Sequence, residues 1–146
     1  MTMSTDQDVF EYMPDLADYG IQDFASDHAK TREDILRRLR VEWWPRFRPY
    51  NDIRFVQPPV MDTDLLDETQ FTRAAVYHVL SYYILPKLAK FDPDGDRFGE
   101  MMKHYRSRFE EEFDYIIKDG VRYDFDDNGN IDSSEQVPAY QTRLVR

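Results

Sequence analysis

The chain contains no cysteine, and its acidic residues outnumber its basic ones. The absence of cysteine excludes disulfides, thiolate zinc sites and cysteine nucleophiles together, and it is consistent with folding in the cytoplasm. The 19 Lys and Arg side chains stand against 29 Asp and Glu, which gives a formal net charge of −10. Because proteins that wrap duplex DNA need basic surface to displace phosphate counterions, we do not expect that function here.

Long hydrophobic runs are missing too. The longest apolar stretch covers residues 76–85, and His78, Ser81 and three tyrosines interrupt it. We therefore expect no segment that spans a bilayer. The first residues carry neither the basic nor the apolar region of a signal peptide, so none is expected. A glycine-rich phosphate loop and a G-x-S-x-G elbow are absent, and the sequence predicts a protein that is not an enzyme.

The chain does contain enough apolar material for one core. Its 146 residues are 41% hydrophobic, which predicts a single domain over residues 1–146. Aromatic residues reach 15%. Tyr and Trp combine an apolar body with a polar group and suit half-buried contacts, so this surplus favours an interaction protein. Residues 1–9 are polar, and we expect a flexible N-terminus there.

Apolar residues recur at helical spacing in three long segments. The predicted helices cover residues 22 or 26 to 44, 67–89 and 97–118, and a short capped turn is expected at 15–20. Pro45 ends the first helix, Pro86 is expected to kink the last turn of the second, and Gly120 stops the third.

These segments predict a mainly α fold, an antiparallel bundle of three to four helices within residues 15–120. A long proline-rich arm at residues 45–66 interrupts the bundle. An acidic turn and a short C-terminal hairpin or tail are expected at residues 121–146, where the helical pattern ends.

The arm holds four prolines, which remove backbone donors and favour irregular structure with a short strand at residues 53–57. Structureless loops of this length are uncommon in compact domains and tend to be functional. The arm residues that we expect to bind a partner are Arg46, Arg48, Tyr50 and Arg54. The alternative is a loop that packs on its own domain.

Residues 124–135 match the calcium-loop pattern D-x-[DN]-x-[DN]-G-x5-E at every specified position. Ca²⁺ takes six to eight oxygen ligands at about 2.3–2.6 Å, and such a loop coils so that its polar side chains point inward. Gly129 would permit the sharp turn, and Asn130 would offer its backbone carbonyl. The predicted ligands are Asp124, Asp126, Asn128, Asn130, Asp132 (directly or through water) and Glu135.

The flanks of this loop argue against calcium. A full EF-hand has a helix on each side, whereas Gly120 breaks the preceding helix and Pro138 follows closely. The alternative is an Asp/Asn/Gly-rich turn between two short strands, without a metal.

Other polar residues do not form a recognisable site. His28, His78 and His104 lack metal-ligand spacing, and His78 on an apolar face is typical of a hydrogen-bonded core histidine. The acidic run at residues 110–112 with Asp114 could suggest paired carboxylates for acid–base chemistry. Between Phe109 and Phe113 on a helix, it indicates a solvated face instead.

Several stretches resemble the small head-to-tail connector (adaptor) proteins of tailed bacteriophages. The resemblance covers residues 67–146 and, more loosely, 15–44. The similar features are Phe71-x-x-Ala74-Ala75-x-x-His78-x-x-x-Tyr82, Met102-x-x-Tyr105-x-x-x-Phe109 and Tyr123-Asp124-Phe125-Asp126. The long proline-rich arm departs from the usual pattern of that family.

The resemblance implies a dodecameric ring beneath the portal of the capsid, at the head–tail interface of the virion. Its partners would be the portal protein and a downstream tail or collar protein, and DNA would pass through without sequence-specific binding. The C-terminal tail, residues 136–146, would reach into the portal through Arg143, Leu144, Val145 and Arg146. The competing hypothesis is a calcium-binding interaction module that uses residues 124–135.

Overall fold

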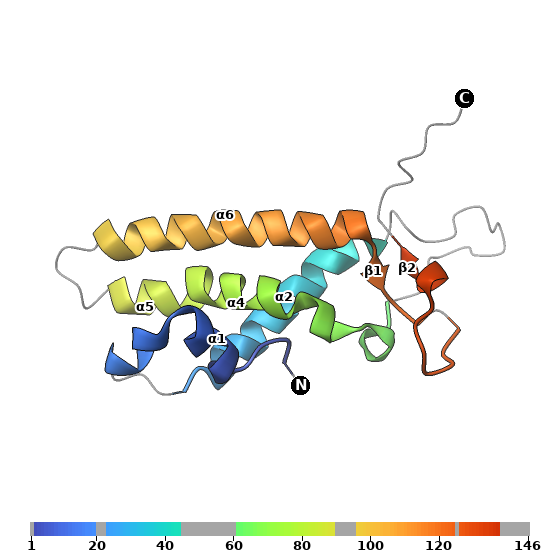
Figure 1. Ribbon diagram of the computed structural model, residues 1–146, viewed down its shortest axis with the longest axis horizontal. Helices are drawn as coiled ribbons and strands as arrows, with labels where there is room; N and C mark the ends of the chain where they lie inside the picture. The colour runs from blue at the N-terminus through green and yellow to red at the C-terminus, as the bar shows by residue number, and fades with distance from the viewer. Residues whose placement is uncertain (1, 20–22, 45–60, 90–95, 125, 138–146) are drawn as a thin grey trace, which may run out of the picture.

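The computed structural model describes residues 2–19, 23–44, 61–89, 96–124 and 126–137. Helices dominate these residues, which confirms the predicted mainly α bundle. The long helix α6 (Asp96–Asp119) lies alongside α4 (Thr72–Val79) and α5 (Leu85–Ala89), and α2 (Ala25–Glu42) packs against α4 from another side (Figure 1). Among the described residues, no helix combines the length and the apolar character that a membrane crossing requires.

The N-terminal segment is part of the fold, so the prediction of a flexible N-terminus is wrong for residues 2–9. Helix α1 (Asp6–Tyr12) begins after Thr5, whose hydroxyl accepts a hydrogen bond from the amide of Asp8 while the Asp8 carboxylate accepts from the amide of Thr5. Val9 is fully buried and Met3 is nearly so. The 3₁₀ turn η1 (Pro14–Tyr19) follows, where the short capped turn was expected.

Helix α2 falls within the predicted range. The carboxylate of Asp23, which precedes the helix, accepts a hydrogen bond from the amide of Ala25, the first helical residue. The buried residues of α2 recur every three or four positions along one face, singly or in adjacent pairs, as in an amphipathic helix. They are Asp27, His28, Thr31, Ile35, Leu36 and Leu39.

The segment predicted as one helix at 67–89 is helical but not uniform. It consists of η3 (Glu68–Phe71), α4, the π-helical turn η4 (Leu80–Ile84) and α5. In the π turn the amide of Leu85 donates to the carbonyl of Leu80, five residues back. Pro86 has no amide hydrogen to donate to the carbonyl of Tyr82, and a proline ring clashes with the carbonyl four residues before it in a regular α-helix. The wider π turn before Pro86 relieves this clash. Tyr82, the last residue of the Phe71–Tyr82 pattern noted in the sequence, is 41% exposed.

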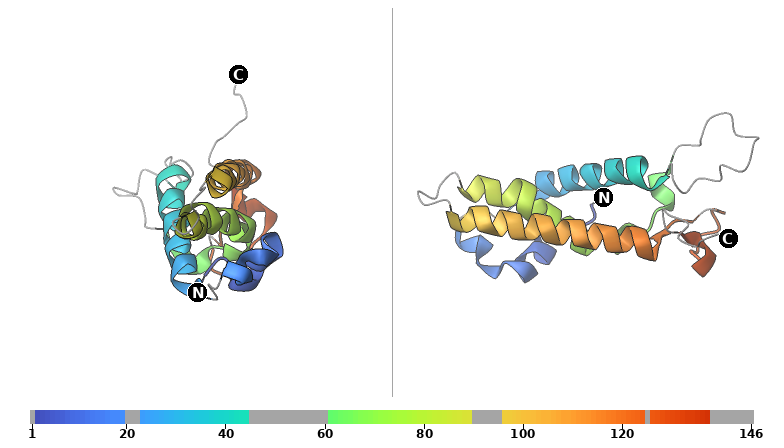
Figure 2. Two further views of the ribbon diagram at one scale, coloured as in Figure 1. Left: turned by 90° about the vertical axis from the view of Figure 1, so that its left-hand side faces the viewer. Right: turned by 90° about the horizontal axis from the view of Figure 1, so that it is seen from above.

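This central segment contributes to two clusters of buried residues that together form the core. One cluster joins Phe71, Ala74, Ala75 and Tyr77 to α2 and to the second half of α6. The other joins Val76, Val79, Leu80, Ile84 and Leu85 to α1, Phe24 and Phe98. Seen along the bundle, α4 and α5 lie between α2 on one side and α1 and α6 on the other (Figure 2).

A small hairpin closes one end of the bundle. Strands β1 (Val121–Arg122) and β2 (Gln136–Val137) pair antiparallel, with Val121 opposite Val137, and the short 3₁₀ turn η5 (Ser133–Glu135) precedes β2. The 3₁₀ turn η2 (Thr63–Leu65) and the bridge between Leu66 and Tyr123 attach the hairpin to the chain before α4. Met61 and Leu66 are buried, so residues 61–66 of the predicted arm belong to the domain. Residues 45–60, with the strand expected at 53–57, lie outside the described residues.

Gly120, the predicted helix stop, requires glycine for two reasons. Its φ is +112°, and a Cβ there would lie 2.7 Å from the backbone oxygen of Gln136. We expect Gly120→Ala to lower the free energy of unfolding by about 2–4 kcal/mol, from backbone strain plus overpacking. The measurement is chemical denaturation followed by circular dichroism.

Gly99→Ala is the matched control, because Gly99 lies inside α6 and a Cβ added there would meet no atom within 4 Å among the described residues. This change should raise stability by about 0.5–1 kcal/mol. Equal effects of the two substitutions would contradict the explanation.

Candidate functional site

The acidic loop at residues 124–135 grows out of the hairpin and is anchored by backbone contacts on both sides. The amide of Asp124 donates to the carbonyl of Leu65 (2.9 Å), and the amide of Tyr123 donates to the carbonyl of Glu135 (3.2 Å). The hydroxyl of Tyr123 accepts a hydrogen bond from the amide of Asp62 (2.9 Å). These bonds hold the entry and exit of the loop side by side.

Asp124 organises the interior of the loop. Its carboxylate is buried and accepts hydrogen bonds from the amides of Asn128 (3.2 Å) and Gly129 (2.9 Å). Burial by itself would raise the pKa of Asp124, but the donated hydrogen bonds outweigh burial and the pKa is lowered. Gly129 has φ +87°, as the sixth position of the calcium-loop pattern requires.

Three carboxylates converge inside this loop. Asp124, Asp126 and Glu135 each offer an oxygen, and these oxygens lie within 4.8 Å of one another. This spacing fits the shell of one calcium ion with ligands at about 2.4 Å. The hydrogen bond between Asp126 and Asp124, with burial and the nearby charge of Glu135, raises the pKa of Asp126. A divalent cation bound here would stabilise the charged form of Asp126.

Asp132 is not part of this carboxylate cluster, and Asn128 and Asn130 form hydrogen bonds within the loop. Asn128 donates its side-chain amide to Asp126 (3.1 Å), and its oxygen accepts from the amide of Asn130 (2.8 Å). Asp132 is exposed, and its amide donates to the carboxylate of Glu135 (3.0 Å). The structure therefore brings together the three carboxylates Asp124, Asp126 and Glu135, and the loop exits through a short 3₁₀ turn in place of the long helix of an EF-hand.

The predicted partner-binding residues lie outside the described residues. These are Arg46, Arg48, Tyr50 and Arg54 of the arm and Arg143, Leu144, Val145 and Arg146 of the tail. The described residues that flank both segments lie together. The rings of Trp44 and Tyr123 are 5.2 Å apart, Met61 belongs to the same core cluster as Val121 and Tyr123, and Val121 pairs with Val137. Both segments therefore join the bundle at the hairpin end.

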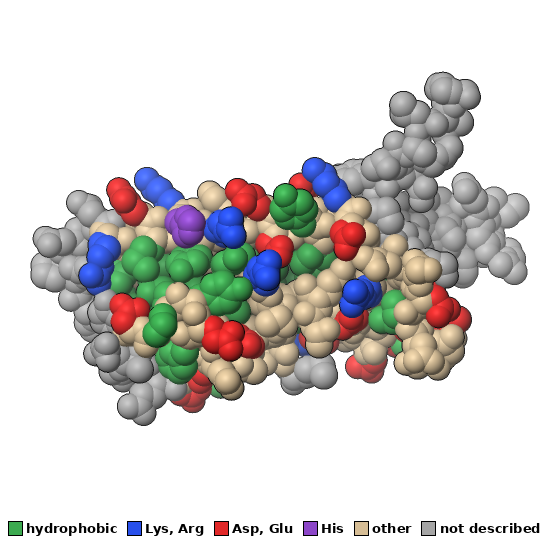
Figure 3. Space-filling model, viewed as in Figure 1, with side chains coloured by type: hydrophobic (Ala, Val, Ile, Leu, Met, Phe, Trp, Pro, Cys, Tyr) green, Lys and Arg blue, Asp and Glu red, His purple; other side chains and the backbone are tan. Residues whose placement is uncertain are grey.

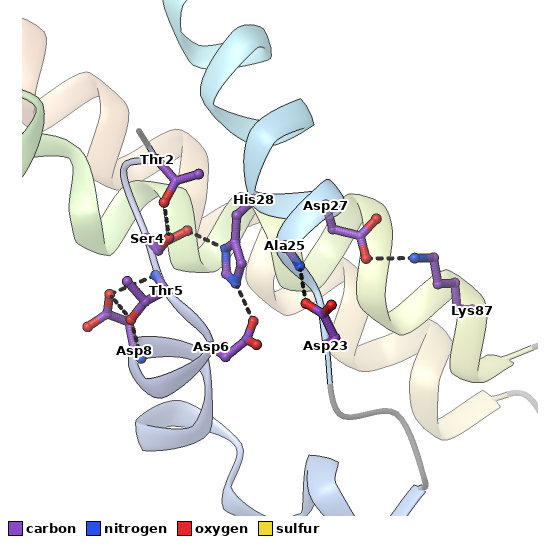
Figure 4. A network of polar contacts seen from close by, with 10 residues as sticks. All are labelled: Thr2, Ser4, Thr5, Asp6, Asp8, Asp23, Ala25, Asp27, His28 and Lys87. Carbon is purple, nitrogen blue, oxygen red and sulfur yellow. Dashed lines mark hydrogen bonds and ion pairs between the residues drawn. The ribbon is translucent and has the colours of Figure 1, made fainter.

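A Ser–His–Asp arrangement between the N-terminal segment and α2 was not predicted (Figure 4). Nδ1 of His28 lies 2.7 Å from the hydroxyl of Ser4, and its Nε2 lies 2.9 Å from the carboxylate of Asp6. Ser4 and His28 are 1% and 3% exposed, so neither is accessible to a substrate. These contacts attach the N-terminal segment to α2. The capping pattern Thr5-x-x-Asp8 could have located α1, but no local signal joins Ser4 to His28.

Figure 4 also shows the buried carboxylate of Asp27, which ties the start of α2 to α5. Its carboxylate accepts a hydrogen bond from Nζ of Lys87 at 2.6 Å. Lys87 is half-exposed while Asp27 is buried. Removal of the lysine would leave an uncompensated buried charge, so the pair is structural.

The acidic run on α6 is compensated by basic partners and does not form a catalytic pair. Glu110 pairs with Arg38 of α2 (2.7 Å), and Lys118 pairs with Asp114 (2.9 Å). Arg108 and Arg73 lie 3.7 Å from Glu111 and Glu112 respectively. The carboxylates point to different basic residues, which agrees with a solvated face.

Comparison with protein families, with curated proteins and with solved structures finds no match to this chain.

His78 is the core histidine that its apolar helix face predicts. Its Nδ1 lies 3.1 Å from the hydroxyl of Thr31, and its ring packs between Tyr82 and Phe109. Burial lowers the pKa of His78 to about 4, and the nearby carboxylate of Asp34 only partly opposes this. The residue is therefore neutral in the folded protein at neutral pH.

This shift predicts a pH dependence of stability. Between the ordinary pKa of about 6.5 and the folded-state pKa of about 4, the unfolded chain binds a proton that the folded protein does not. His78 should therefore cost up to about 3 kcal/mol of stability as pH falls through this window. Denaturation of wild type and His78→Gln from pH 7 to pH 4 measures it. Parallel pH profiles would show that His78 does not titrate in this way.

Proposed function

We propose that this protein is a structural subunit, without catalytic activity, of a homo-oligomeric ring that joins a phage portal to the next tail component. The supporting observation is that the predicted arm and the predicted tail both join the bundle at the hairpin end, beside Trp44, Met61 and Val137. A subunit built in this way can direct two contact segments toward neighbouring components and keep the sides of its bundle for adjacent subunits.

The assignment of this subunit to a phage ring rests on the resemblance of its sequence to phage head-to-tail adaptors. The portal would be one partner, and a tail or collar protein would be the other. The ring would be dodecameric, and the subunit would be made in the host cytoplasm and incorporated at the head–tail interface of the virion.

The charge of the chain suits such a ring. Each subunit carries a formal net charge of −10, so twelve subunits around a channel would create a negative field. That field repels the phosphates of DNA, which lets DNA pass without binding to the wall. Sequence-specific recognition of DNA is not part of the proposal.

The C-terminal tail provides the direct test. Truncation after Val137 removes residues 138–146 and keeps the pairing of β1 with β2. We expect the truncated protein to keep its helical circular dichroism and to lose co-sedimentation with capsids that carry the portal. Many weak tails acting together give strong binding, so their removal should weaken attachment by at least about a hundredfold.

The matched control removes residues at the other end of the chain, before the Thr5 cap. Deletion of residues 1–2 should leave co-sedimentation unchanged, because Thr2 is exposed and its hydroxyl bonds to the backbone of its neighbour Ser4. Unchanged co-sedimentation of the tail-truncated protein would contradict the proposal for the tail. Wild-type protein that neither forms rings nor attaches to capsids would contradict the assigned function.

A calcium-binding interaction module is the second candidate function, and the convergence of Asp124, Asp126 and Glu135 within 4.8 Å supports it. In this function, a bound cation would rigidify the loop at the end of the bundle where the arm and the tail join it. The helices carry their own core, so calcium would stabilise the loop more than the domain.

Isothermal titration with Ca²⁺ tests this candidate. Asp126→Asn should weaken binding by at least about tenfold, and Asp132→Asn, which removes the same charge outside the cluster, should have a smaller effect. At about fivefold excess over Kd, calcium should add only about 1 kcal/mol of stability. No binding at millimolar calcium would exclude this function, whereas unfolding of the helices on calcium removal would contradict a stabilisation confined to the loop.

A further inference from the structure

The outer face of α2 carries basic charge that the described part of the fold does not compensate. Its exposed residues at helical spacing are Lys30, Glu33, Arg37, Arg40 and Val41. Neither Arg37 nor Arg40 forms an ion pair with any residue that the structure describes. Val41, next to Arg40, is 66% exposed. This stripe therefore combines an apolar side chain with two arginines that have no acidic partner among the described residues.

A groove lies where α1, α4 and α6 meet, on the face where hydrophobic side chains gather in Figure 3. It consists of two adjoining hollows of about 380 and 170 Å³, which share Arg73 and Glu112 in their walls. Tyr12 and Tyr115 lie at this groove and are 38% and 70% exposed. Exposed tyrosines beside a groove are typical of surfaces that bind other proteins.

The groove has an excess of negative charge. Its two arginines are already compensated, because Arg73 lies 3.7 Å from Glu112 and Arg108 lies 3.7 Å from Glu111. Two further acidic residues, Asp8 and Glu11, line the larger hollow. Asp8 caps α1 and Glu11 has no basic partner among the described residues. The groove thus offers acidic partners of the kind that could pair with Arg37 and Arg40.

The two surfaces lie on different sides of the molecule. In the view along the bundle, α2 is on one side of α4 and α5, and α1 and α6 are on the other (Figure 2). Contact between two different surfaces of identical subunits is heterologous, and it produces a closed ring when the rotation between neighbours closes. A two-fold dimer buries the same patch on both copies, and two surfaces on different sides of the molecule do not form one such patch.

We infer that the outer face of α2 in one copy, centred on Arg37, Arg40 and Val41, docks into the α1–α4–α6 groove of the next copy. This inference rests on the proposed ring and identifies the contact between its subunits. Arginines meet the acidic side of the groove, and Val41 meets the exposed tyrosines. Because each copy carries −10 overall, local attraction of this kind is needed to offset long-range repulsion.

The first experiment reverses the charge on α2. Arg37→Glu with Arg40→Glu should weaken self-association by at least about tenfold, measured by sedimentation velocity, and should remove rings from negatively stained images. The control, Lys103→Glu with Arg106→Glu, makes the same charge change on exposed residues of α6 that do not line the groove. Circular dichroism checks that both variants are folded.

The second experiment restores the contact. Glu11→Arg with Glu111→Arg reverses the groove, and this variant alone should also fail to assemble. A mixture of the α2 variant and the groove variant should form rings again, because contacts in the mixture can then pair opposite charges. Recovery in the mixture cannot be explained by misfolding of either variant.

The outcomes separate the interface from the ring. Rings that persist in the α2 variant, or equal loss in the α2 variant and its control, overturn the interface and leave the ring in place. Failure of the mixture to assemble also overturns the interface. A wild-type protein that remains monomeric or stops at a dimer overturns the ring and this interface together.

Discussion

Burial of the segment from Ala74 to Ser81 is the constraint on which the rest of the structure depends. Every residue from Ala74 to Ser81 is buried, so this segment must be covered on all sides. Helix α2 covers one side, α6 and α1 cover the others, and both core clusters draw residues from it. The polar residues inside it are therefore matched by partners. His78 meets Thr31 and stays neutral because burial lowers its pKa, and Ser81 donates to the carbonyl of His78.

The charges of α6 run against the preference of an isolated helix. Basic residues predominate in its first half and acidic residues in its second half, whereas the helix macrodipole favours the reverse. Other elements compensate the acidic half, above all Arg38, whose guanidinium pairs with Glu110 and lies over the rings of Phe109 and Phe113. This arrangement gives the outer surface a defined distribution of charge. The interface that we infer between subunits uses arginines of α2 that have no acidic partner among the described residues.

The hairpin end of the bundle places a sharp glycine turn next to the acidic loop. Gly120 lets the chain reverse sharply after α6, so that β1 and β2 pair directly beside the core. Gln70 donates to the carbonyl of Gly120 and accepts from the amide of Arg122, which fixes the start of the hairpin on the central segment. The acidic loop and the described residues that flank the arm and the tail all lie at this hairpin.

The sequence by itself determined the helices, the helix stop and the candidate metal ligands, because each depends on residues close together in the chain. Periodic apolar residues specified α2 and α6, and the spacing of Asp124, Asp126 and Glu135 specified the carboxylates that converge. Only the tertiary structure decided which distant residues pair. Ser4 meets His28, Arg38 meets Glu110, and residues 61–66 pack under Tyr123, although no local pattern indicates these contacts. The physical reason is that helical periodicity is a local property, whereas pairing across helices depends on how their buried faces fit together.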